Sequence, residues 1–537
     1  MELRVLDLFC GAGGFSEGFT QAGHKVIWAV DNWQPAVLTH GQNHPSSKTI
    51  RDDVIRLSKL PDAEFHIIVP DAEIIIGSPP CIAFSNSNKS GKGDKDLGKQ
   101  LIIAFLRIIA RKKWALNSVL KYWILENVPN ADGYISEKYS AADLGLAGDR
   151  TLIVKGDTSG VYYAEDFGVP SKRKRYFCGE FPKPKAVIVD EREYLTLRQI
   201  KEKLGEPYEK IHTFIEDPNY FLSLPGEEVT DHHYTQIIPR FQWEKAKRLK
   251  IDKGYMGKMS FPENEAKPAR TIMATMTFGA RESMIFSYGE DQYRAPTIRE
   301  VASLMSFPIC YRFFGDSILT KYRLVGNAVP PKLALAFGKA IAEEMGEYNL
   351  DRYQCKVFLG ADGFFNLNEK LIPTPKEKPR IGKSRFRYHI PLLKINQYRV
   401  ELTNHNSNFT CEKILWSVEI HYSQGKNAQK FTPQPSVEWI PRDLQPVVNT
   451  FIQAKSKEIP NHKRLQEIYC LTSEERCTKR LIGPLELLLQ VKEFLDSLQF
   501  SSENRMEVLL NEKPLVLPLK AAIGYYILKS IVNHMEG

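Results

Sequence analysis

An apolar run, Ala72 to Ile76, ends at Gly77 and leads directly into the loop Ser78-Pro79-Pro80-Cys81. The run is short and rich in β-branched residues, which predicts a buried parallel strand. Cys81 then lies just past the carboxyl end of that strand, the edge at which open α/β sheets bind ligands. Two prolines fix backbone φ angles before the thiol, so the loop is stiff. Most lone cysteines only pack, but a cysteine on a stiff loop at this edge is a candidate nucleophile.

A glycine-rich turn follows the first predicted strand. Leu3 to Leu8 predicts the strand, and Phe9-Cys10-Gly11-Ala12-Gly13-Gly14-Phe15 leads from it into a helix that runs to about Ala22. Glycines let a ligand approach the backbone closely. A dinucleotide-binding turn would have a further glycine where Ser16 stands, so that fingerprint fails. Taken alone, the turn could be a tight connection without a ligand.

The second predicted strand, Lys25 to Val30, ends at Asp31. Doubly wound nucleotide-binding folds place an acidic residue at this point against ribose hydroxyls. Asp31 is therefore the candidate ribose-binding residue. The alternative is an ordinary N-cap for the next helix.

Two further sets of polar residues accompany predicted strands. Tyr122 to Leu125 predicts a buried strand that ends in Glu126-Asn127-Val128-Pro129. A carboxyl group there is placed to be partly desolvated, which suits a proton donor. In the basic run Ser171-Lys172-Arg173-Lys174-Arg175, strand alternation would put Arg173 and Arg175 on the same side. This pair can face a catalytic pocket.

In their order along the chain, these motifs resemble those of the cytosine-C5 DNA methyltransferases, over roughly residues 1 to 346. The last match, Leu324 to Pro331, resembles the segment that folds back beside the first helix in this family. The resemblance implies S-adenosylmethionine as cofactor, without a metal. It assigns catalysis to Cys81, Glu126, Arg173 and Arg175, and DNA contacts to Ser85, Ser87 and Arg173. It assigns the cofactor pocket to Phe9, Gly11, Gly13, Phe15, Asp31, Trp33, Asp53, Val54, Pro79, Asn327 and Ala328.

Some details of the match stay open. Ser171 and Ile82 stand where the family usually has glutamine, and the consequence of either replacement is not predicted. Asp53 is expected to contact the adenine amino group, with Asp52 as the alternative.

The resemblance also implies a mechanism. The Cys81 thiolate adds to C6 of cytosine, C5 takes the methyl group, and S-adenosylhomocysteine is the product. A free cysteine, with a pKa of about 8.5, is only a few per cent thiolate near neutral pH. Arg173 is the predicted cationic neighbour of the thiolate, and Glu126 is expected to donate to N3. Because the target atom is unreachable inside a duplex, the base must be flipped out.

The expected fold class is α/β, with a Rossmann-like methyltransferase sheet, an inserted target-recognition domain and an α+β C-terminal extension. At 537 residues the chain is long for one domain. The expected domains are a discontinuous catalytic domain, a recognition domain and an extension of unknown role, at residues 1–180 plus 316–348, 181–315 and 349–537. In the extension we expect a basic linker at Pro373 to Arg387, strands at Tyr398 to Leu402 and Ile414 to Tyr422, and a helix at Leu481 to Phe500.

The composition is that of a globular protein, with 43% hydrophobic and 26% charged residues. Of the net charge of +9, +7 falls after Leu350, where 27 Lys and Arg face 20 Asp and Glu. Eight scattered cysteines without a CxxC pair argue against a disulfide framework and a structural zinc site, and favour reduced thiols. Without a membrane-spanning or signal-peptide pattern, we expect a cytoplasmic, nucleoid-associated prokaryotic protein.

The sequence thus predicts a monomeric DNA (cytosine-5-)-methyltransferase that modifies a specific duplex sequence and protects host DNA in a restriction-modification system. A separately encoded restriction endonuclease is a candidate partner. One alternative is an RNA (tRNA) cytosine-C5 methyltransferase, against which the long recognition segment argues. The other is a methyltransferase-like DNA-binding protein, against which the set Cys81, Glu126 and Arg173 argues. For the extension, a DNA-binding or oligomerisation module is favoured over a nuclease, because no nuclease motif is found.

Overall fold

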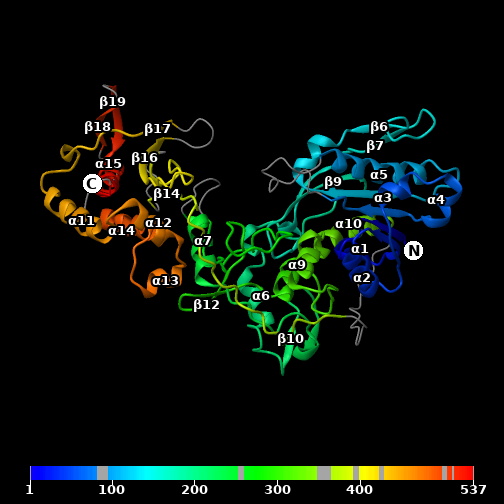
Figure 1. Ribbon diagram of the computed structural model, residues 1–537. Coiled ribbons are helices and arrows are strands. Elements are labelled where there is room, and N and C mark those ends of the chain that lie inside the picture. The colour runs from blue at the N-terminus through cyan, green and yellow to red at the C-terminus, as the bar shows by residue number, and fades with distance from the viewer. Residues whose placement is uncertain are drawn as a thin grey trace. The chain divides into compact units, whose positions relative to one another are not determined.

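The computed structural model describes residues 2–80, 95–251, 259–346, 364–390, 398–422, 429–498, 505–510 and 513–535. The chain forms two compact units, shown in Figure 1. The first unit comprises Met1–Ile238 and Phe261–Thr374, and the second comprises Pro239–Ser260 and Pro375–Gly537.

A seven-stranded sheet is the centre of the first unit. Five of its strands are parallel, and two pair antiparallel at one edge. In spatial order the strands are β3 (Lys48–Arg51), β2 (Lys25–Asp31), β1 (Arg4–Leu8), β4 (Ile74–Gly77), β5 (Tyr122–Asn127), β9 (Lys174–Glu180) and β8 (Gly160–Tyr163). The expected α/β fold class is confirmed.

The central strands are apolar on both faces, as strands covered by helices on both sides should be. Side chains alternate along each strand, so that Leu6 and Ile75 enter one core while Val5 and Ile74 enter the other. The first core is covered by α3 (Val54–Ser58), α4 (Asp62–Ile68) and α5 (Lys95–Lys113). The second core is covered by α1 (Gly14–Gln21) and α10 (Pro331–Glu344).

Helices α1 and α10 pack in close backbone contact although more than 300 residues separate them. A Cβ atom at Gly14 would lie 2.1 Å from the carbonyl oxygen of Val329, and one at Gly18 would lie 2.4 Å from that of Pro331. Only glycine fits at these two positions. The chain therefore returns beside its first helix, and the segment that ends at Pro331 lies next to the glycine-rich turn.

The remainder of the first unit surrounds a separate apolar core. Its helices are α2 (Gln34–Asn43), α6 (Leu197–Leu204), α8 (Ile298–Leu304) and α9 (Ile318–Asn327). Its short strand pairs are β10 (Phe214–Glu216) with β11 (Ser223–Pro225), and β12 (Phe286–Gly289) with β13 (Gln292–Arg294). A further pair, β6 (Lys138–Ser140) with β7 (Thr151–Ile153), packs instead against the first core of the large sheet through Tyr139 and Leu152.

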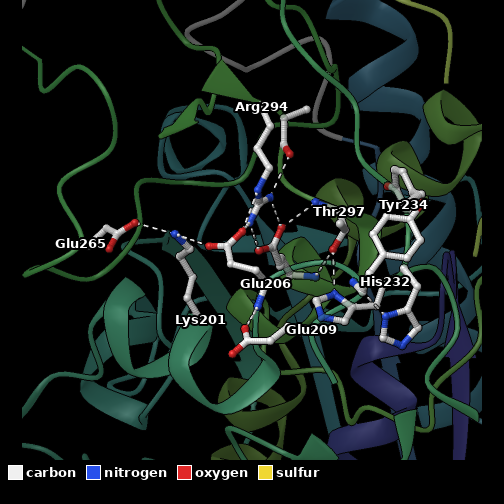
Figure 2. Close-up of polar contacts among 12 residues, drawn as sticks. Lys201, Glu206, Glu209, His232, Tyr234, Glu265, Arg294 and Thr297 are labelled. Atoms are coloured by element: carbon white, nitrogen blue, oxygen red, sulfur yellow. Dashed lines mark hydrogen bonds and ion pairs between the residues drawn. The ribbon is translucent and has the colours of Figure 1, made fainter. Parts of the chain in front are cut away.

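A buried ionic network joins several of these elements. Figure 2 shows Arg294 beside Glu206, at 2.7 Å, and Lys201 between Glu206 and Glu265, at 3.0 and 2.7 Å. Arg294 also pairs with Glu300 at 2.7 Å, and both side chains are almost fully buried. The Glu206 and Glu300 carboxylates and the Ala295 carbonyl accept from the buried Arg294 guanidinium. The network fixes β13 and α8 to the residues that follow α6.

The second unit is an α+β domain, as expected for the extension. An antiparallel sheet contains β14 (Arg387–His389), β15 (Tyr398–Thr403), β16 (Ser417–Tyr422) and β17 (Gln429–Phe431), and β18 (Arg505–Leu510) pairs with β19 (Lys513–Pro518). The helices are α7 (Arg240–Ile251), α11 (Gln445–Glu458), α12 (His462–Cys470), α13 (Ser473–Thr478), α14 (Pro484–Ser497) and α15 (Leu519–His534). Helix α15 is buried in the core of this unit.

The chain crosses between the units after Ile238, Ser260 and Thr374. Helix α7, from within residues 181–315, thus belongs to the second unit. Residues 364–374 belong to the first unit, where Lys321 forms a buried ion pair with Asp231 at 2.8 Å and the backbone N–H of Leu367 donates to the same carboxylate at 3.0 Å.

The expectation of uniformly reduced thiols is wrong in one place. Cys310 is disulfide-bonded, whereas the thiols of Cys10, Cys178, Cys411, Cys470 and Cys477 are free. Sequence spacing does not reveal a single bond between distant cysteines. In the described ranges, no helix is long and apolar enough to span a membrane.

Candidate functional site

The glycine-rich turn leaves β1 through residues with positive φ angles. Phe9, Gly11 and Gly13 have φ values of 61°, 53° and 88°. Such a conformation is unusual for phenylalanine and is often found at functional sites. A Cβ atom at Gly11 would have no heavy atom within 4 Å, so there is open space beside this backbone. The Tyr311 hydroxyl donates to the Ala12 carbonyl at 2.6 Å, which fixes the backbone of the turn.

Asp31 lies at the carboxyl end of β2, beside this turn. Its carboxylate accepts from the backbone N–H of Gly11 at 3.0 Å and from that of Trp33 at 2.8 Å. Burial raises the pKa of Asp31, while these N–H donors oppose the rise. The carboxylate thus fixes the turn and the start of α2 together. Its role toward ribose stays a prediction, and the two hydrogen bonds leave lone pairs for a hydroxyl group.

Trp33 precedes α2, and one face of its ring is occupied. The Arg323 guanidinium from α9 lies 4.8 Å from the ring centroid. An adenine that stacks on Trp33 would therefore use the other face.

Asp52 and Asp53 have different partners in the structure. The Asp52 carboxylate accepts from Arg56 Nε at 2.8 Å, and this ion pair lowers the pKa of Asp52. Asp53 is exposed and caps α3, since one of its oxygens accepts from the backbone N–H of Ile55 at 2.7 Å. Asp53 keeps its second oxygen for a ligand, which favours it over Asp52. Val54 is only 2% exposed and lies in the core.

A buried polar chain beneath the turn was not found from the sequence. Ser16 Oγ donates to Asp7 at 2.6 Å and lies 2.9 Å from His40 Nε2. The other nitrogen of His40 lies 2.7 Å from the Thr49 hydroxyl. Burial raises the pKa of Asp7 to about 7 and lowers that of His40 well below its usual value. The only available signal was Asp7 and Ser16, polar residues at positions that should be buried.

We expect Asp7 to make folding stability depend on pH. Its folded-state pKa of about 7 exceeds its ordinary value, so the folded state keeps a proton that the unfolded chain loses above about pH 4. The free energy of unfolding should then fall as pH rises from about 4 to 7, by at most about 4 kcal/mol from this group. Asp7→Asn should lack this component. Urea unfolding of both proteins between pH 4.5 and 8 measures it, and parallel curves would contradict the assignment.

Three polar side chains, those of Ser78, Glu126 and Arg175, meet at the carboxyl ends of β4 and β5. The Glu126 carboxylate lies 2.8 Å from Arg175 Nε, and Ser78 Oγ donates to it at 2.5 Å. The side chains of Glu126 and Arg175 are 5% and 13% exposed. Asn127 Nδ2 donates to the Pro79 carbonyl at 3.1 Å and anchors the proline loop. Ser78 was missed from the sequence, although it lies in the motif that contains Pro79.

Arg173 lies apart from this group. It is 1% exposed, and its guanidinium donates to the backbone carbonyls of Ile272, Gly326 and Ala328, each at 3.0 Å. The guanidinium faces backbone carbonyls in the interior of the first unit, and its expected roles in catalysis and DNA contact stay predictions. Strand β9 begins only after Arg173, so alternation within the strand does not extend to this residue. Arg173 instead joins the residues just before β9 to Ile272 and to the C-terminal end of α9.

Replacing Arg173 should therefore destabilise the fold. Arg173→Met leaves three backbone carbonyls without this donor, and we expect a loss of about 3–5 kcal/mol in the free energy of unfolding. The exposed neighbour Lys172 is the control, and Lys172→Met should change stability by less than about 0.5 kcal/mol. Urea unfolding measures both. Wild-type stability with lost activity in Arg173→Met would return this residue to the chemistry.

Other predicted positions are accounted for as follows. Phe15 is buried and packs edge-on against Phe19 and Phe177, at 5.7 and 6.3 Å between ring centroids. Ser171 Oγ donates to the Leu304 carbonyl at 2.8 Å and joins β9 to α8. Asn327 is exposed at the end of α9, and Ala328 is buried after it.

Cys81, Ile82, Ser85 and Ser87 lie outside the described residues. The last described residue before them is Pro80, at the same sheet edge as Glu126 and Arg175. Among the residues that the structure describes, no group of three or more His, Cys, Asp or Glu side chains could hold a metal ion.

The family match includes most of the first unit and the α7 segment of the second. Residues 3–343 match the family model described as C-5 cytosine-specific DNA methylase. The chain is 25% identical to "Type II methyltransferase M.NgoPII" of Neisseria gonorrhoeae, covering 64% of this chain and 96% of that protein. It is 30% identical to "Type II methyltransferase M1.HphI" of Haemophilus parahaemolyticus (64% and 87% covered) and to "Type II methyltransferase M.HgiDI" of Herpetosiphon aurantiacus (62% and 92% covered).

Proposed function

Because the chain belongs to the C-5 cytosine-specific DNA methylase family, we propose that Cys81, Glu126 and Arg175 act together on one cytosine of a specific duplex sequence. The chain is an S-adenosylmethionine-dependent DNA (cytosine-5-)-methyltransferase. The observation that carries the proposal is the position of Glu126, held by Ser78 and Arg175 at the sheet edge from which the Cys81 loop departs.

The turn after β1 fits S-adenosylmethionine. Gly11 has open space beside its backbone, and the Asp31 carboxylate lies at the end of the neighbouring strand. We propose that Gly11, Gly13 and Phe9 bind the amino-acid part, and that Asp31, Trp33 and Asp53 bind the nucleoside. When bound, the cofactor supplies an electrophilic methyl group on sulfur.

Cys81 supplies the nucleophile for the base. C5 of cytosine is a poor nucleophile, and addition of the Cys81 thiolate to C6 makes C5 nucleophilic. Once C5 carries the methyl group, loss of its proton and expulsion of the thiolate restore the aromatic ring. The two prolines before Cys81 restrict the loop, so less entropy is lost on aligning the sulfur.

Glu126 is proposed to stabilise the negative charge that addition of the thiolate creates on the ring. Addition to C6 pushes negative charge toward N3 of the ring, and a carboxyl group that donates there stabilises it. Ser78 and Arg175 hold the carboxyl group from its two oxygens, so it is already oriented when the base enters. Arg175 also adds positive charge where negative charge develops. These contacts act only if the base has left the duplex, so we propose base flipping.

The relatives named as type II methyltransferases suggest the biological role. We propose that the enzyme protects host DNA within a restriction-modification system and that a separately encoded endonuclease cleaves the same sequence. The residues between β9 and α9 that remain in the first unit are proposed to read that sequence. This division differs from the boundaries expected from sequence in two places, since α7 folds with the second unit and residues 364–374 fold with the first.

The test is transfer of labelled methyl from S-adenosylmethionine to mixed-sequence duplex DNA, followed by base-resolution mapping. We expect label at C5 of cytosine within one short motif, and none on tRNA. Label on tRNA without label on DNA would contradict the proposal. DNA label spread over cytosines in every sequence context would contradict the part that concerns specificity.

A further inference from the structure

Positive charge is distributed unevenly between the two units. The residues of the second unit include 31 Lys and Arg against 19 Asp and Glu, a net charge of +12, whereas the rest of the chain has 42 against 45. Within the second unit, the segment that contains α7 contributes seven Lys and Arg and two Asp and Glu. An enzyme whose substrate is a polyanion thus has its net positive charge outside the unit that contains Glu126 and the cofactor turn.

The most basic stretch of the second unit is Pro375 to Arg387, which we call the basic strip. It contains six Lys and Arg and one acidic residue, Glu377. The sequence predicts a linker here, but the structure shows the strip fixed to helices. The backbone N–H of Arg380 donates to the Cys470 carbonyl at 2.8 Å, and that of Ser473 donates to Glu377 at 2.6 Å.

Two further contacts fix the strip to α12. Tyr469 donates its hydroxyl to the Arg385 carbonyl at 2.9 Å, and the Arg380 guanidinium lies 4.9 Å from the centroid of the Tyr469 ring. These contacts hold the backbone in place from 377 to 385. The strip is thus a preformed surface, and ligand binding would not have to order it.

Three lysines of the strip, Lys376, Lys378 and Lys383, are exposed. In the described part of the chain, no carboxylate pairs with any of them, although Arg380 of the same strip pairs with Glu377. The eight residues from Lys376 to Lys383 are joined by seven Cα–Cα steps, which span at most about 25 Å. This is the axial rise of about seven base pairs at 3.4 Å each, so the lysines can reach successive phosphates of one strand.

We propose that the basic strip binds the phosphate backbone of duplex DNA, adding affinity without sequence preference. The inference rests on the proposed function, because the polyanion is taken to be the substrate duplex. Charge complementarity identifies the partner: three exposed ammonium groups on a fixed backbone, in a unit of net charge +12, match a regular row of phosphates. The strip thus supplies anchoring, while the first unit supplies chemistry.

The test compares two triple variants of the full-length protein. Lys376→Gln, Lys378→Gln and Lys383→Gln together remove the strip charges. The control replaces Lys25, Lys48 and Lys121 by glutamine, which removes the same charge at the amino ends of β2, β3 and β5, opposite the edge that carries Glu126. Binding of a labelled mixed-sequence duplex is measured at several salt concentrations, and methyl transfer is measured at saturating DNA.

We expect the strip variant to bind duplex about tenfold more weakly at low salt, with the slope of log affinity against log salt reduced by about 2 to 3. Its turnover at saturating DNA should equal that of the wild type, and the control should bind as the wild type does. Unchanged affinity and slope in the strip variant would overturn the inference. The inference would also be overturned, in favour of an RNA partner, if the strip variant bound tRNA about tenfold more weakly but bound duplex DNA as the wild type does.

Failure of the proposed function would look different. In that case the wild-type protein transfers no methyl group to duplex DNA. This result does not depend on whether the strip variant changes DNA affinity. The binding arm therefore judges the strip, and the turnover of the wild type judges the enzyme.

Discussion

Cys81→Ser is expected to lower methyl transfer to DNA by at least about 10⁴-fold, because the hydroxyl group cannot replace the thiolate that adds to C6. Binding of S-adenosylmethionine and of duplex DNA should stay within about threefold of the wild type, since the substitution changes one atom. Single-turnover transfer of labelled methyl measures the first effect, and equilibrium titrations measure the second.

Cys411→Ser is the matched control for this substitution. Cys411 is an exposed free thiol of the second unit, and its replacement should leave turnover unchanged. Undiminished turnover in Cys81→Ser would remove the thiol from the mechanism. A parallel loss of cofactor binding would instead assign Cys81 a structural role.

The second large effect is expected at Glu126. Glu126→Gln keeps the shape of the side chain but removes the carboxyl group, so turnover should fall by about 10²–10⁴-fold with little change in DNA affinity. Steady-state kinetics measure this. Glu180→Gln, at the far end of β9 where the carboxylate is exposed, is the control and should retain turnover. Turnover of Glu126→Gln within about twofold of the wild type would exclude Glu126 as the group that acts on N3.

Much of the fold could be predicted because its signals are local. The runs that became β4 and β5 are apolar up to their carboxyl ends, since helices cover both faces, whereas β1 contains the buried Asp7. Glu126 and Pro80 therefore reach one edge by strand order alone.

The partners of buried charges could not be predicted in this way. Arg173 contacts carbonyls of residues 272, 326 and 328, which are 99 to 155 positions away, and a basic run carries no sign of them. The same holds for His40, whose bond to Ser16 depends on how α2 lies against α1.

The unit boundaries show a second limit. Sequence composition changes near residue 349, but the first unit continues to Thr374. The Asp231 carboxylate, buried in its ion pair with Lys321, accepts from the backbone N–H of Leu367 and so fixes the segment 364–374 to the first unit. Helix α7 lies within the stretch that the sequence assigns to target recognition, yet it folds with the second unit, where Arg248 lies 4.6 Å from the centroid of the Tyr388 ring. Only tertiary packing decides such an assignment.

The measurement that tests the central claim most directly is capture of the covalent enzyme–DNA species. Fluorine at C5 cannot leave as a proton does, so duplex DNA that contains 5-fluorocytosine should halt the reaction with the base attached to sulfur. We predict a complex that survives denaturation, forms only with S-adenosylmethionine present, and yields a peptide with the base attached at Cys81. Methylation of ordinary cytosine without any such complex, or attachment at another residue, would contradict the account.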